Sequence, residues 1–244
     1  MNSPFLSVII PAHNEALRLP DTLEKMQQFI RQQPYQVELI VVENASQDPT
    51  AQVVREWQAR LPELSLISLP EAGKGNAVRV GMLAAHGAYR FMADADLSMP
   101  ITEINKFLPP NLPDSVVAIG SREVPGSKRI DEPPYRHFTG RVFNTLVRWL
   151  ALPKIQDSQC GFKCFRADAA ARVFPLQTML GWSFDVEILA IARELGYPVV
   201  EIPITWVYRP GSQVKLVSDS WRMAKDLLHI RANIKKGVYR AQML

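Results

Sequence analysis

Two carboxylates one residue apart, Asp94 and Asp96, follow the apolar run from Tyr89 to Ala93. At the end of a strand both side chains reach a common space once the chain turns, and a divalent cation best relieves their mutual repulsion. An all-oxygen site that keeps water and ligand phosphates is typical of Mg²⁺ or Mn²⁺. The pair is compatible with a metal site, although an isolated Asp-x-Asp is more often a pair of carboxylates in a surface turn.

A second pattern that could bind a ligand is the run Gly73-Lys74-Gly75-Asn76-Ala77. Two glycines flank a lysine there, at the expected start of a helix. Backbone N–H groups and a cation in that position suit a phosphate, and a plain helix-entry turn is the alternative. The run is not a P-loop, because no glycine stands five residues before Gly73 and Asn76 replaces Ser or Thr. No Gly-x-Gly-x-x-Gly follows the first strand, so the dinucleotide-binding fingerprint is missing as well.

Short apolar runs alternate with amphipathic segments through the first half of the chain. We expect strands at residues 6–10, 37–42, 64–69 and 89–93, and helices at residues 17–30, 48–60 and 75–86. Continuous Val/Ile runs separated by helices predict an α/β fold with a parallel sheet covered on both faces. Ligands bind at the carboxyl ends of such strands, so the polar residues 11–15, 43–46 and 94–96 should gather there.

The second half of the chain is less regular. Strands are expected at residues 116–120, 199–202 and 205–208, and helices at residues 136–150 and 184–195. Residues 121–134 are interpreted as a long loop of the kind that covers active sites or binds acceptors. A basic amphipathic helix is expected at about 215–240, and since no linker interrupts the chain, residues 1–244 are interpreted as a single domain.

Charge is unevenly distributed along the 244 residues. The net charge is +4, but residues 209–244 hold eight Lys or Arg against two Asp, a local charge of +6, which leaves −2 for residues 1–208. A basic end on a near-neutral body suits an anionic membrane surface, an acidic ligand or nucleic acid, or is a solvated helix face. No interleaved aromatic pattern supports nucleic acid, and we expect none to bind.

Composition and short-range patterns exclude several classes of protein. With 47% hydrophobic and 21% charged residues and no fixed repeat, the chain is expected to be globular. Cys160 and Cys164 lack the further ligands of a zinc site, so reduced thiols are expected. No signal peptide and no run of ~18 apolar residues is found, and we expect a cytoplasmic protein, peripheral on the cytoplasmic face of a membrane.

The strand-end segments together resemble the nucleotide-sugar half of family 2 glycosyltransferases of the GT-A fold. The matching runs are residues 7–15, 41–48, 73–77 and 94–96, in the same order and spacing. In the second half, residues 157–165, 182–187, 210–212 and 223–228 resemble the dolichyl-phosphate β-glucosyltransferases and, more distantly, the dolichyl-phosphate mannose synthases. The most specific run is Asp157-Ser158-Gln159-Cys160-Gly161-Phe162-Lys163.

This resemblance implies an inverting transfer of one sugar, glucose from UDP-glucose, to a polyprenyl or dolichyl phosphate with Mg²⁺ or Mn²⁺ as cofactor. The implied metal ligands are Asp94 and Asp96, and the implied catalytic residues are Asp96, Asp157 and Asp185. The implied donor-binding residues are Pro11, Asn14, Glu15, Glu43, Ser46, Lys74, Asp94 and Arg209. The implied acceptor-phosphate residues are Arg122 and Arg136. The basic end would hold the enzyme on an anionic membrane surface.

Some neighbours of these residues are given other roles. Asp185 and Glu187 lie two apart on an expected helix, so only one of them is expected to face the sugar. Lys163 and Cys160 are expected to hold their loop together rather than to take part in chemistry. Trp182 is as compatible with the core as with stacking on the sugar or the lipid.

Departures from the family pattern leave the donor and the acceptor open. The usual Asp-Asp pair after the second strand is Glu43-Asn44 here, so the donor base is not fixed and GDP-mannose is a second candidate. Thr145 stands where the Gln-x-x-Arg-Trp motif of processive synthases needs Gln, so polymerisation is disfavoured. The N-terminal anchor of eukaryotic members is not expected. A soluble glycan acceptor and a catalytically silent nucleotide-sugar-binding module are also compatible with the pattern, and the retained carboxylate pair argues against the silent module.

Overall fold

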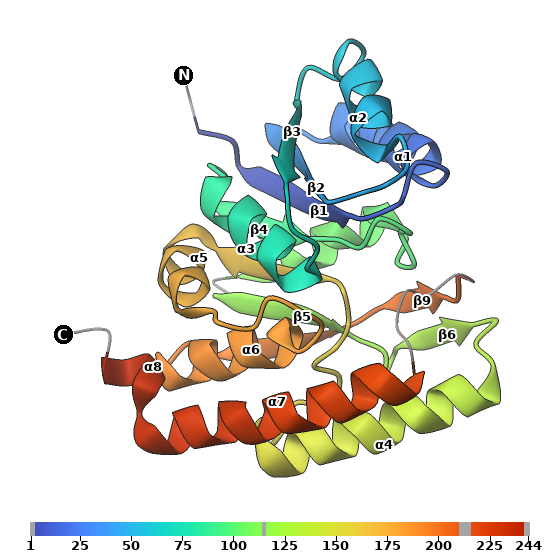
Figure 1. The fold of residues 1–244 in the computed structure, drawn as a ribbon. Coiled ribbons are helices and arrows are strands. Elements are labelled where there is room, and N and C mark those ends of the chain that lie inside the picture. Colours follow the sequence, from blue (N-terminus) through green and yellow to red (C-terminus); the bar gives the residue numbers. More distant parts are fainter. Residues whose placement is uncertain (1–2, 114–115, 210–215, 242–244) are drawn as a thin grey trace.

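Seven strands form one sheet in the order β3-β2-β1-β4-β7-β5-β8 in the computed structural model, which describes residues 3–113, 116–209 and 216–241 (Figure 1). The side chains of residues 136, 138, 139 and 216–221 are outside the description. The strands are β1 (Leu6–Ala12), β2 (Val37–Asn44), β3 (Leu64–Leu69), β4 (Tyr89–Met92), β5 (Val117–Ser121), β7 (Lys163–Arg166) and β8 (Val199–Pro203). Only β7 runs antiparallel to its neighbours, which confirms the predicted α/β fold with a mainly parallel sheet.

Helices follow most of these strands, close to the predicted positions. They are α1 (Leu19–Gln32), α2 (Thr50–Gln58), α3 (Lys74–Ala84), α4 (Pro134–Leu150), α5 (Ala167–Val173), α6 (Phe184–Glu194), α7 (Leu216–Lys236) and α8 (Val238–Ala241), with 3₁₀ turns at η1 (Ile101–Phe107) and η2 (Phe174–Leu176). The sequence analysis did not predict β7, α5 or the two 3₁₀ turns.

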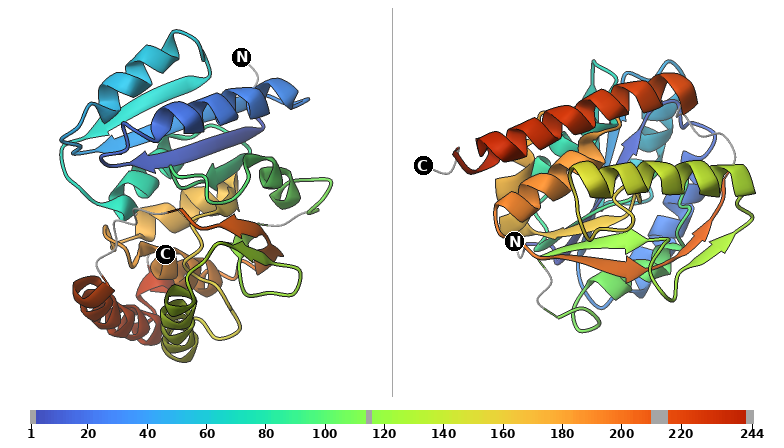
Figure 2. Two further views of the ribbon diagram at one scale, coloured as in Figure 1. Left: turned by 90° about the vertical axis from the view of Figure 1, so that its right-hand side faces the viewer. Right: turned by 90° about the horizontal axis from the view of Figure 1, so that it is seen from below.

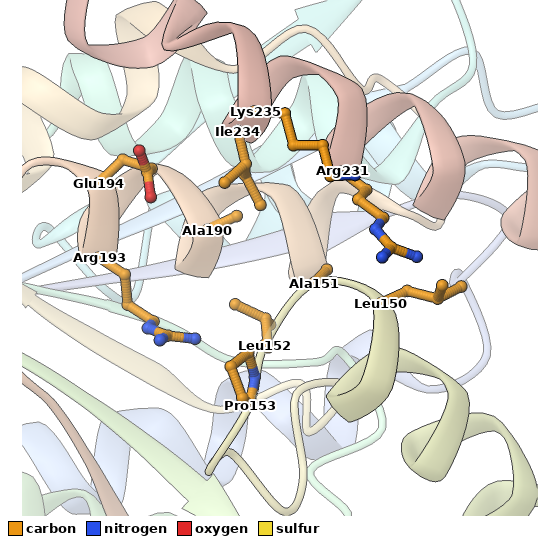
Figure 3. A pocket seen from close by; sticks show the side chains of 10 residues that line it. All are labelled: Leu150, Ala151, Leu152, Pro153, Ala190, Arg193, Glu194, Arg231, Ile234 and Lys235. Atoms are coloured by element: carbon orange, nitrogen blue, oxygen red, sulfur yellow. The ribbon is translucent and has the colours of Figure 1, made fainter.

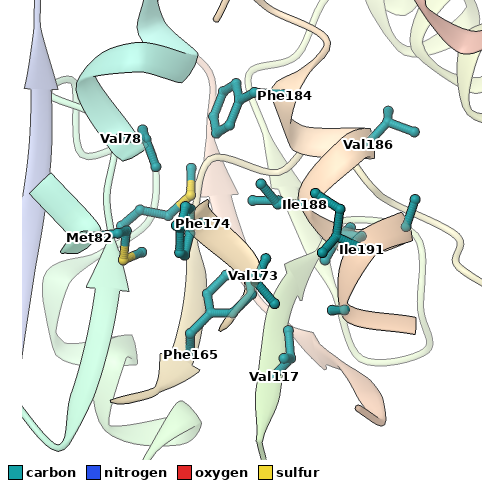
Figure 4. Close-up of a cluster of buried hydrophobic side chains, with 14 of the residues drawn as sticks. Val78, Met82, Val117, Phe165, Val173, Phe174, Phe184, Val186, Ile188 and Ile191 are labelled. Atoms are coloured by element: carbon teal, nitrogen blue, oxygen red, sulfur yellow. The ribbon is translucent and has the colours of Figure 1, made fainter. Parts of the chain in front are cut away.

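Side chains along β1 alternate between two hydrophobic cores, one on each face of the sheet. Leu6, Val8 and Ile10 are fully buried in the core that contains α1 and α2, whereas Ile9 is fully buried in the core that contains α3. Both faces are covered, so the strand is apolar at nearly every position, with Ser7 as the exception, rather than alternating between apolar and polar residues. Figure 4 shows the second core, where Met82, Phe165 and Phe174 meet side chains of α6.

The predicted loop at residues 121–134 holds a short strand, β6 (Lys128–Ile130). It pairs in parallel with β9 (Thr205–Val207), with Lys128 opposite Thr205. This small second sheet lies next to the amino-terminal end of α4 (Figure 1). It fixes part of a segment that was expected to lack regular structure.

The predicted basic helix is α7, and α4 runs beside it in an outer layer (Figures 1 and 2). Its apolar stripe faces inward, because Met223, Leu227 and Ile230 are buried. The helix ends earlier than the predicted boundary of about 240: Gly237 has φ 67°, a left-handed conformation that ends α7 before α8. No described helix is both long enough and apolar enough to span a membrane.

The close packing of α3 on the sheet gives a stability test with two helical glycines. A Cβ at Gly81 would lie 2.4 Å from Ile9 Cγ2 and 2.9 Å from Val42 Cγ2. We expect Gly81→Ala to lower the free energy of unfolding, measured in urea, by about 1–3 kcal/mol through overpacking. Gly140→Ala in α4, where a Cβ meets nothing within 4 Å, should raise it by up to ~1 kcal/mol through helix propensity. Shifts of the same sign would contradict this packing.

Candidate active site

Three adjacent parallel strands, β2, β1 and β4, bring their carboxyl ends to one edge of the sheet. Ala12 at the end of β1 is paired with Glu43 of β2, and Ile9 is paired with Met92 of β4. The polar segments that follow the three strands therefore start side by side, as the sequence predicted.

Asn44 links the segments after β1 and β2 to the start of α3. With its amide oriented to satisfy both groups, Nδ2 donates to the Ala12 carbonyl oxygen at 2.6 Å, and Oδ1 accepts from the Gly73 N–H at 2.8 Å. The side chain is buried, so both hydrogen bonds are made away from water. An ionised aspartate could not donate the first bond, which gives a physical reason for asparagine at this departure from the family pattern.

Three predicted donor-binding residues form a hydrogen-bonded pair of turns. Ser46 Oγ accepts from the Asn14 N–H at 3.1 Å, and Glu43 Oε1 accepts from the Ser46 N–H at 2.5 Å. Asn14 and Ala45 both have φ 55°, a left-handed conformation that non-glycine residues seldom adopt. Such backbone conformations persist only where surrounding contacts enforce them, and they concentrate at ligand sites.

Glu15 and Pro11 lie at the same end of β1. Pro11 is buried within the strand. Burial raises the pKa of the Glu15 carboxyl, Arg18 opposes this rise from 3.2 Å, and the negative charges of Asp96 and Asp94 add to it. The structure therefore brings Glu15 close to the predicted metal pair.

Lys74 is the first residue of α3, and its Nζ lies 2.6 Å from Asp94 Oδ1. It also lies 5.6 Å from the centre of the Trp182 ring. Burial would lower the pKa of Lys74, but the charges of Asp94 and Asp185 outweigh burial and raise it. The lysine is thus a permanent cation at the carboxylate pair, placed with an aromatic ring beside it.

The two glycines around Lys74 serve a different contact from the one predicted. A Cβ on Gly73 would lie 2.8 Å from the Leu180 carbonyl oxygen, and a Cβ on Gly75 would lie 2.6 Å from that of Met179. The Asn76 N–H donates to the Leu180 carbonyl oxygen at 3.1 Å. The close backbone approach is therefore to the protein's own 179–181 segment, and Lys74 is the group of this run that remains suited to a phosphate.

Gly161 lies against the carboxylate of Asp94. A Cβ there would lie 1.9 Å from Asp94 Oδ2 and 2.7 Å from Oδ1, so no larger residue fits without moving the carboxylate. The sequence analysis did not single out Gly161, since no pattern within the chain shows which side chain a glycine will contact.

Asp96 is the second carboxylate of the pair, and its Oδ1 accepts from the Ser98 N–H at 3.0 Å. Burial, followed by the neighbouring charge of Asp94, raises the pKa of Asp96. In the described parts of the chain, no group of three His, Cys, Asp or Glu side chains could hold a metal ion. Two carboxylates suffice for Mg²⁺ or Mn²⁺ that keeps water and takes phosphate oxygens, so the residues present fit such an ion.

Lys163 and Asp185 form an ion pair inside the protein. Lys163 is fully buried and donates to Asp185 Oδ1 and, at 2.5 Å, to the Cys160 carbonyl oxygen. Burial raises the pKa of Asp185, and the Lys163 and Lys74 ammonium groups oppose this rise. The prediction that Lys163 holds its loop together is supported by these contacts, and Lys163 is in addition the main partner of a predicted catalytic residue.

Glu187 is fully buried away from this network. Its carboxylate accepts from the Thr178 N–H at 2.8 Å, from the Met179 N–H at 2.7 Å and from the Tyr239 hydroxyl at 3.1 Å. Glu187 therefore fixes the segment that packs on α3, and only Asp185 of the two acidic residues lies near Lys74.

Arg122 and Asp157 form a second buried ion pair, at the end of β5. Arg122 donates from Nε to Asp157 Oδ2 at 2.7 Å and from Nη2 to Oδ1 at 2.8 Å. Burial would raise the pKa of Asp157, but the guanidinium outweighs it and lowers the pKa. The guanidinium carbon lies 5.4 Å from the centre of the Trp206 ring, and Glu201 accepts from the Asp157 N–H at 3.0 Å. Asp157 is thus committed to holding Arg122.

Two further arginines, Arg209 and Arg136, were predicted to bind phosphate. Arg209 is exposed and follows β9, whose Val207 N–H donates to the Ser98 carbonyl oxygen at 2.7 Å, close in sequence to Asp96. The Arg136 side chain and the 210–212 run lie outside the description.

The buried Lys163–Asp185 pair yields a second test. We expect Lys163→Met to lower the free energy of unfolding at pH 7 by about 3–5 kcal/mol, because it leaves Asp185 buried and unpaired. The unpaired carboxyl has a folded-state pKa above its unfolded value, so the deficit should shrink as the pH falls toward 4 and Asp185 takes up a proton. Urea unfolding of the wild type and the variant at pH 7 and pH 4 measures this difference in the free energy of unfolding.

The matched control is the double variant Lys163→Met/Asp185→Leu, which removes both charges. It should regain most of the lost stability. A deficit that is independent of pH, or a double variant as unstable as the single one, would show that the loss comes from packing rather than from the unpaired carboxyl.

Comparisons with known proteins identify the family of this chain. Residues 7–174 match the model of glycosyl transferase family 2. The chain is 33% identical to dolichyl-phosphate beta-glucosyltransferase of Dictyostelium discoideum, with 97% of this chain and 76% of the relative covered. It is 34% identical to the enzyme of that name from Saccharomyces cerevisiae, with 97% and 77% covered.

Among solved structures, glucosyl-3-phosphoglycerate synthase from Mycobacterium tuberculosis in complex with Mn²⁺, UDP and glucosyl-3-phosphoglycerate has a TM-score of 0.67 at 16% identity, with 95% of this chain and 80% of that chain covered. The same enzyme with Mg²⁺ and UDP has a TM-score of 0.65, with 95% and 79% covered. These likenesses show the fold, and the family match and the relatives show the family. The chain belongs to glycosyl transferase family 2 and is a glycosyltransferase of the GT-A fold.

Proposed function

We propose that the protein transfers one glucose from UDP-glucose to a polyprenyl or dolichyl phosphate, with inversion at the sugar. The main support for the proposal is a set of charged groups at the ends of the strands. The carboxylate pair lies beside Lys74 on the donor side, and Arg122, which follows β5, is held by Asp157. The names of the relatives supply the acceptor class, and the UDP bound in structures of the same fold supports the donor base.

Asp96, with Asp94, would hold a Mg²⁺ or Mn²⁺ ion on the donor diphosphate. When bound, the metal neutralises negative charge that develops on the leaving nucleoside diphosphate. Lys74 would add a second cation next to the donor diphosphate, because its ammonium group already lies beside Asp94. Pro11, Asn14, Glu15, Glu43 and Ser46 would line the nucleoside part of the donor site, and Arg209 would meet a phosphate.

Arg122 would bind the acceptor phosphate, with Arg136 as a second cation. A phosphate monoester has a second pKa near ~6, so at neutral pH the acceptor is largely a dianion and needs positioning more than deprotonation. Asp157 would act as a positioning residue, because both of its oxygens accept from Arg122. Asp185 would face the sugar hydroxyls, and Trp182 beside Lys74 would pack against the sugar.

The reaction is tested with labelled UDP-glucose and, in parallel, GDP-mannose, a polyprenyl phosphate in detergent, and Mg²⁺ or Mn²⁺. We expect lipid-extractable label from UDP-glucose, and a fall of at least ~100-fold in Asp96→Asn because a charge-stabilising group is lost. Asp168→Asn is the matched control: Asp168 is an exposed residue of α5 paired with Arg166, and its variant should keep wild-type activity.

Other outcomes of this transfer assay would identify another donor, another acceptor or a protein without transferase activity. Label from GDP-mannose alone would identify a mannosyltransferase. Label that appears only with a soluble glycan acceptor would move the enzyme to that branch of the family. Binding of UDP-glucose without transfer to any acceptor would identify the silent binding module.

We further propose that the outer layer of α4 and α7 rests on an anionic membrane surface. Tyr135, Val142 and Trp149 recur every seven residues on α4 and are all exposed, with Trp149 at 78%. The apolar stripe of α7 is buried, so its exposed Arg222 and Lys225 supply charge and α4 supplies the apolar contact. Each cation near an anionic bilayer contributes about 1 kcal/mol. Two helices, rather than the terminal helix alone, would then make the predicted membrane contact.

Vesicle co-sedimentation tests the membrane contact. Val142→Ser/Trp149→Ser should weaken binding to anionic vesicles at least about tenfold, because both side chains would leave the interface. Leu17→Ser removes a leucine that precedes α1 and is 97% exposed, more than either α4 residue, and should not change binding. Equal binding by the wild type and the α4 variant would contradict the proposed surface.

A further inference from the structure

A cavity of about 240 Å³ lies in the outer layer that contains α4 and α7 (Figure 3). It is formed where α4 ends, between the last turns of α6 and α7. Leu150, Leu152, Pro153, Ala190 and Ile234 make its apolar wall, and Arg193, Arg231 and Lys235 provide its cations. None of the residues assigned to sugar transfer lines it.

The three cations of this cavity lack acidic partners. Among the described residues, no carboxylate lies within ion-pair distance of Arg193, Arg231 or Lys235. The acidic residue in the lining is Glu194, and its Oε2 is taken by Arg240 Nε at 2.8 Å. The cavity therefore combines an apolar wall with cations that no described acidic residue neutralises.

Helix ends offset part of this positive charge. α4, α6 and α7 all end at the cavity, and each helix carboxyl end carries a partial charge of roughly −0.5. Arg193 and Lys235 stand in the last turns of their helices, where cations balance this charge. Three cations against about −1.5 still leave the cavity positive, and Arg231 lies one turn before the end of α7.

We propose that this cavity binds the phosphate headgroup of an anionic phospholipid from the membrane on which α4 and α7 rest. The positive charge of Arg231, Lys235 and Arg193 around the cavity would attract the phosphate, and the glycerol and first acyl carbons would lie on the apolar wall. A free phosphate would use the cations alone and leave that wall exposed to water. Trp149 directly precedes the lining residue Leu150 and is 78% exposed, so the cavity adjoins the proposed membrane surface. This inference rests on the proposed membrane contact.

The test uses a short-chain phosphatidylglycerol below its micelle concentration, measured by isothermal titration calorimetry on the full chain. Its phosphodiester differs from the phosphate monoester of the proposed sugar acceptor. We expect binding of one molecule per protein. Arg231→Gln/Lys235→Gln should weaken it about tenfold, from roughly threefold for each partly exposed ion pair. The control Arg55→Gln/Lys128→Gln removes one exposed Arg and one exposed Lys outside the cavity and outside the proposed membrane surface, and should weaken binding less than about threefold.

Two further arms identify the source of the phosphate. Inorganic phosphate should bind at least about tenfold more weakly than the lipid, because it makes no apolar contact. Phosphatidylcholine of the same chain length should not bind detectably. Equal weakening by the two double variants would overturn the cavity as the site, and equal affinity for inorganic phosphate would overturn the lipid headgroup as its ligand.

Sugar transfer in detergent separates this inference from the proposed reaction. The cavity variant should keep wild-type transfer to a detergent-soluble polyprenyl phosphate while it loses lipid binding. A protein that binds phosphatidylglycerol through Arg231 and Lys235 but transfers no sugar would still support the cavity. A protein that transfers sugar but does not bind the lipid would overturn it.

Discussion

The buried ammonium group of Lys163 is the contact on which the candidate site depends. It joins Asp185 at the start of α6 to the carbonyl of Cys160, and so fixes the segment from Asp157 to Lys163 between the sheet and α6. Within this one segment, Asp157 forms an ion pair with Arg122, and Gly161 packs closely against the carboxylate of Asp94. Seven consecutive residues thereby contact a cation, Arg122, one carboxylate of the predicted metal pair, Asp94, and a buried acid, Asp185.

Charges held in this way cost free energy that the rest of the fold must offset. Taking an ion pair out of water is not a net source of stability unless the geometry is close and the remaining polar atoms are satisfied. The two hydrophobic cores on the faces of the sheet supply the stability, and the ion pairs supply orientation. A site of this kind keeps its groups in place before any substrate arrives, which is what electrostatic catalysis requires.

The first half of the fold could be predicted from the sequence, because apolar periodicity locates buried parallel strands and their helices well. The strand β7 was not predicted, because it is four residues long, runs antiparallel and carries Lys163 inward, so it lacks the pattern of a buried strand. Resemblance to the family named the residues of the site, but not their partners. That Asp157 pairs with Arg122 depends on contacts 35 residues apart, and no local pattern encodes such a distance. In the same way, the apolar residues of α7 at helical spacing predicted the helix, but their spacing did not show that they pack against the core.

The position of a bound metal ion tests the central claim most directly. Crystals grown with Mn²⁺ and UDP, measured at the manganese absorption edge, would locate the ion from its anomalous scattering. One peak about 2.1 Å from a carboxylate oxygen of Asp96, with the UDP diphosphate on the ion and near Lys74, is the expected result. A manganese peak elsewhere, or UDP bound away from the Asp94–Asp96 edge, would contradict the assignment of this edge as the active site.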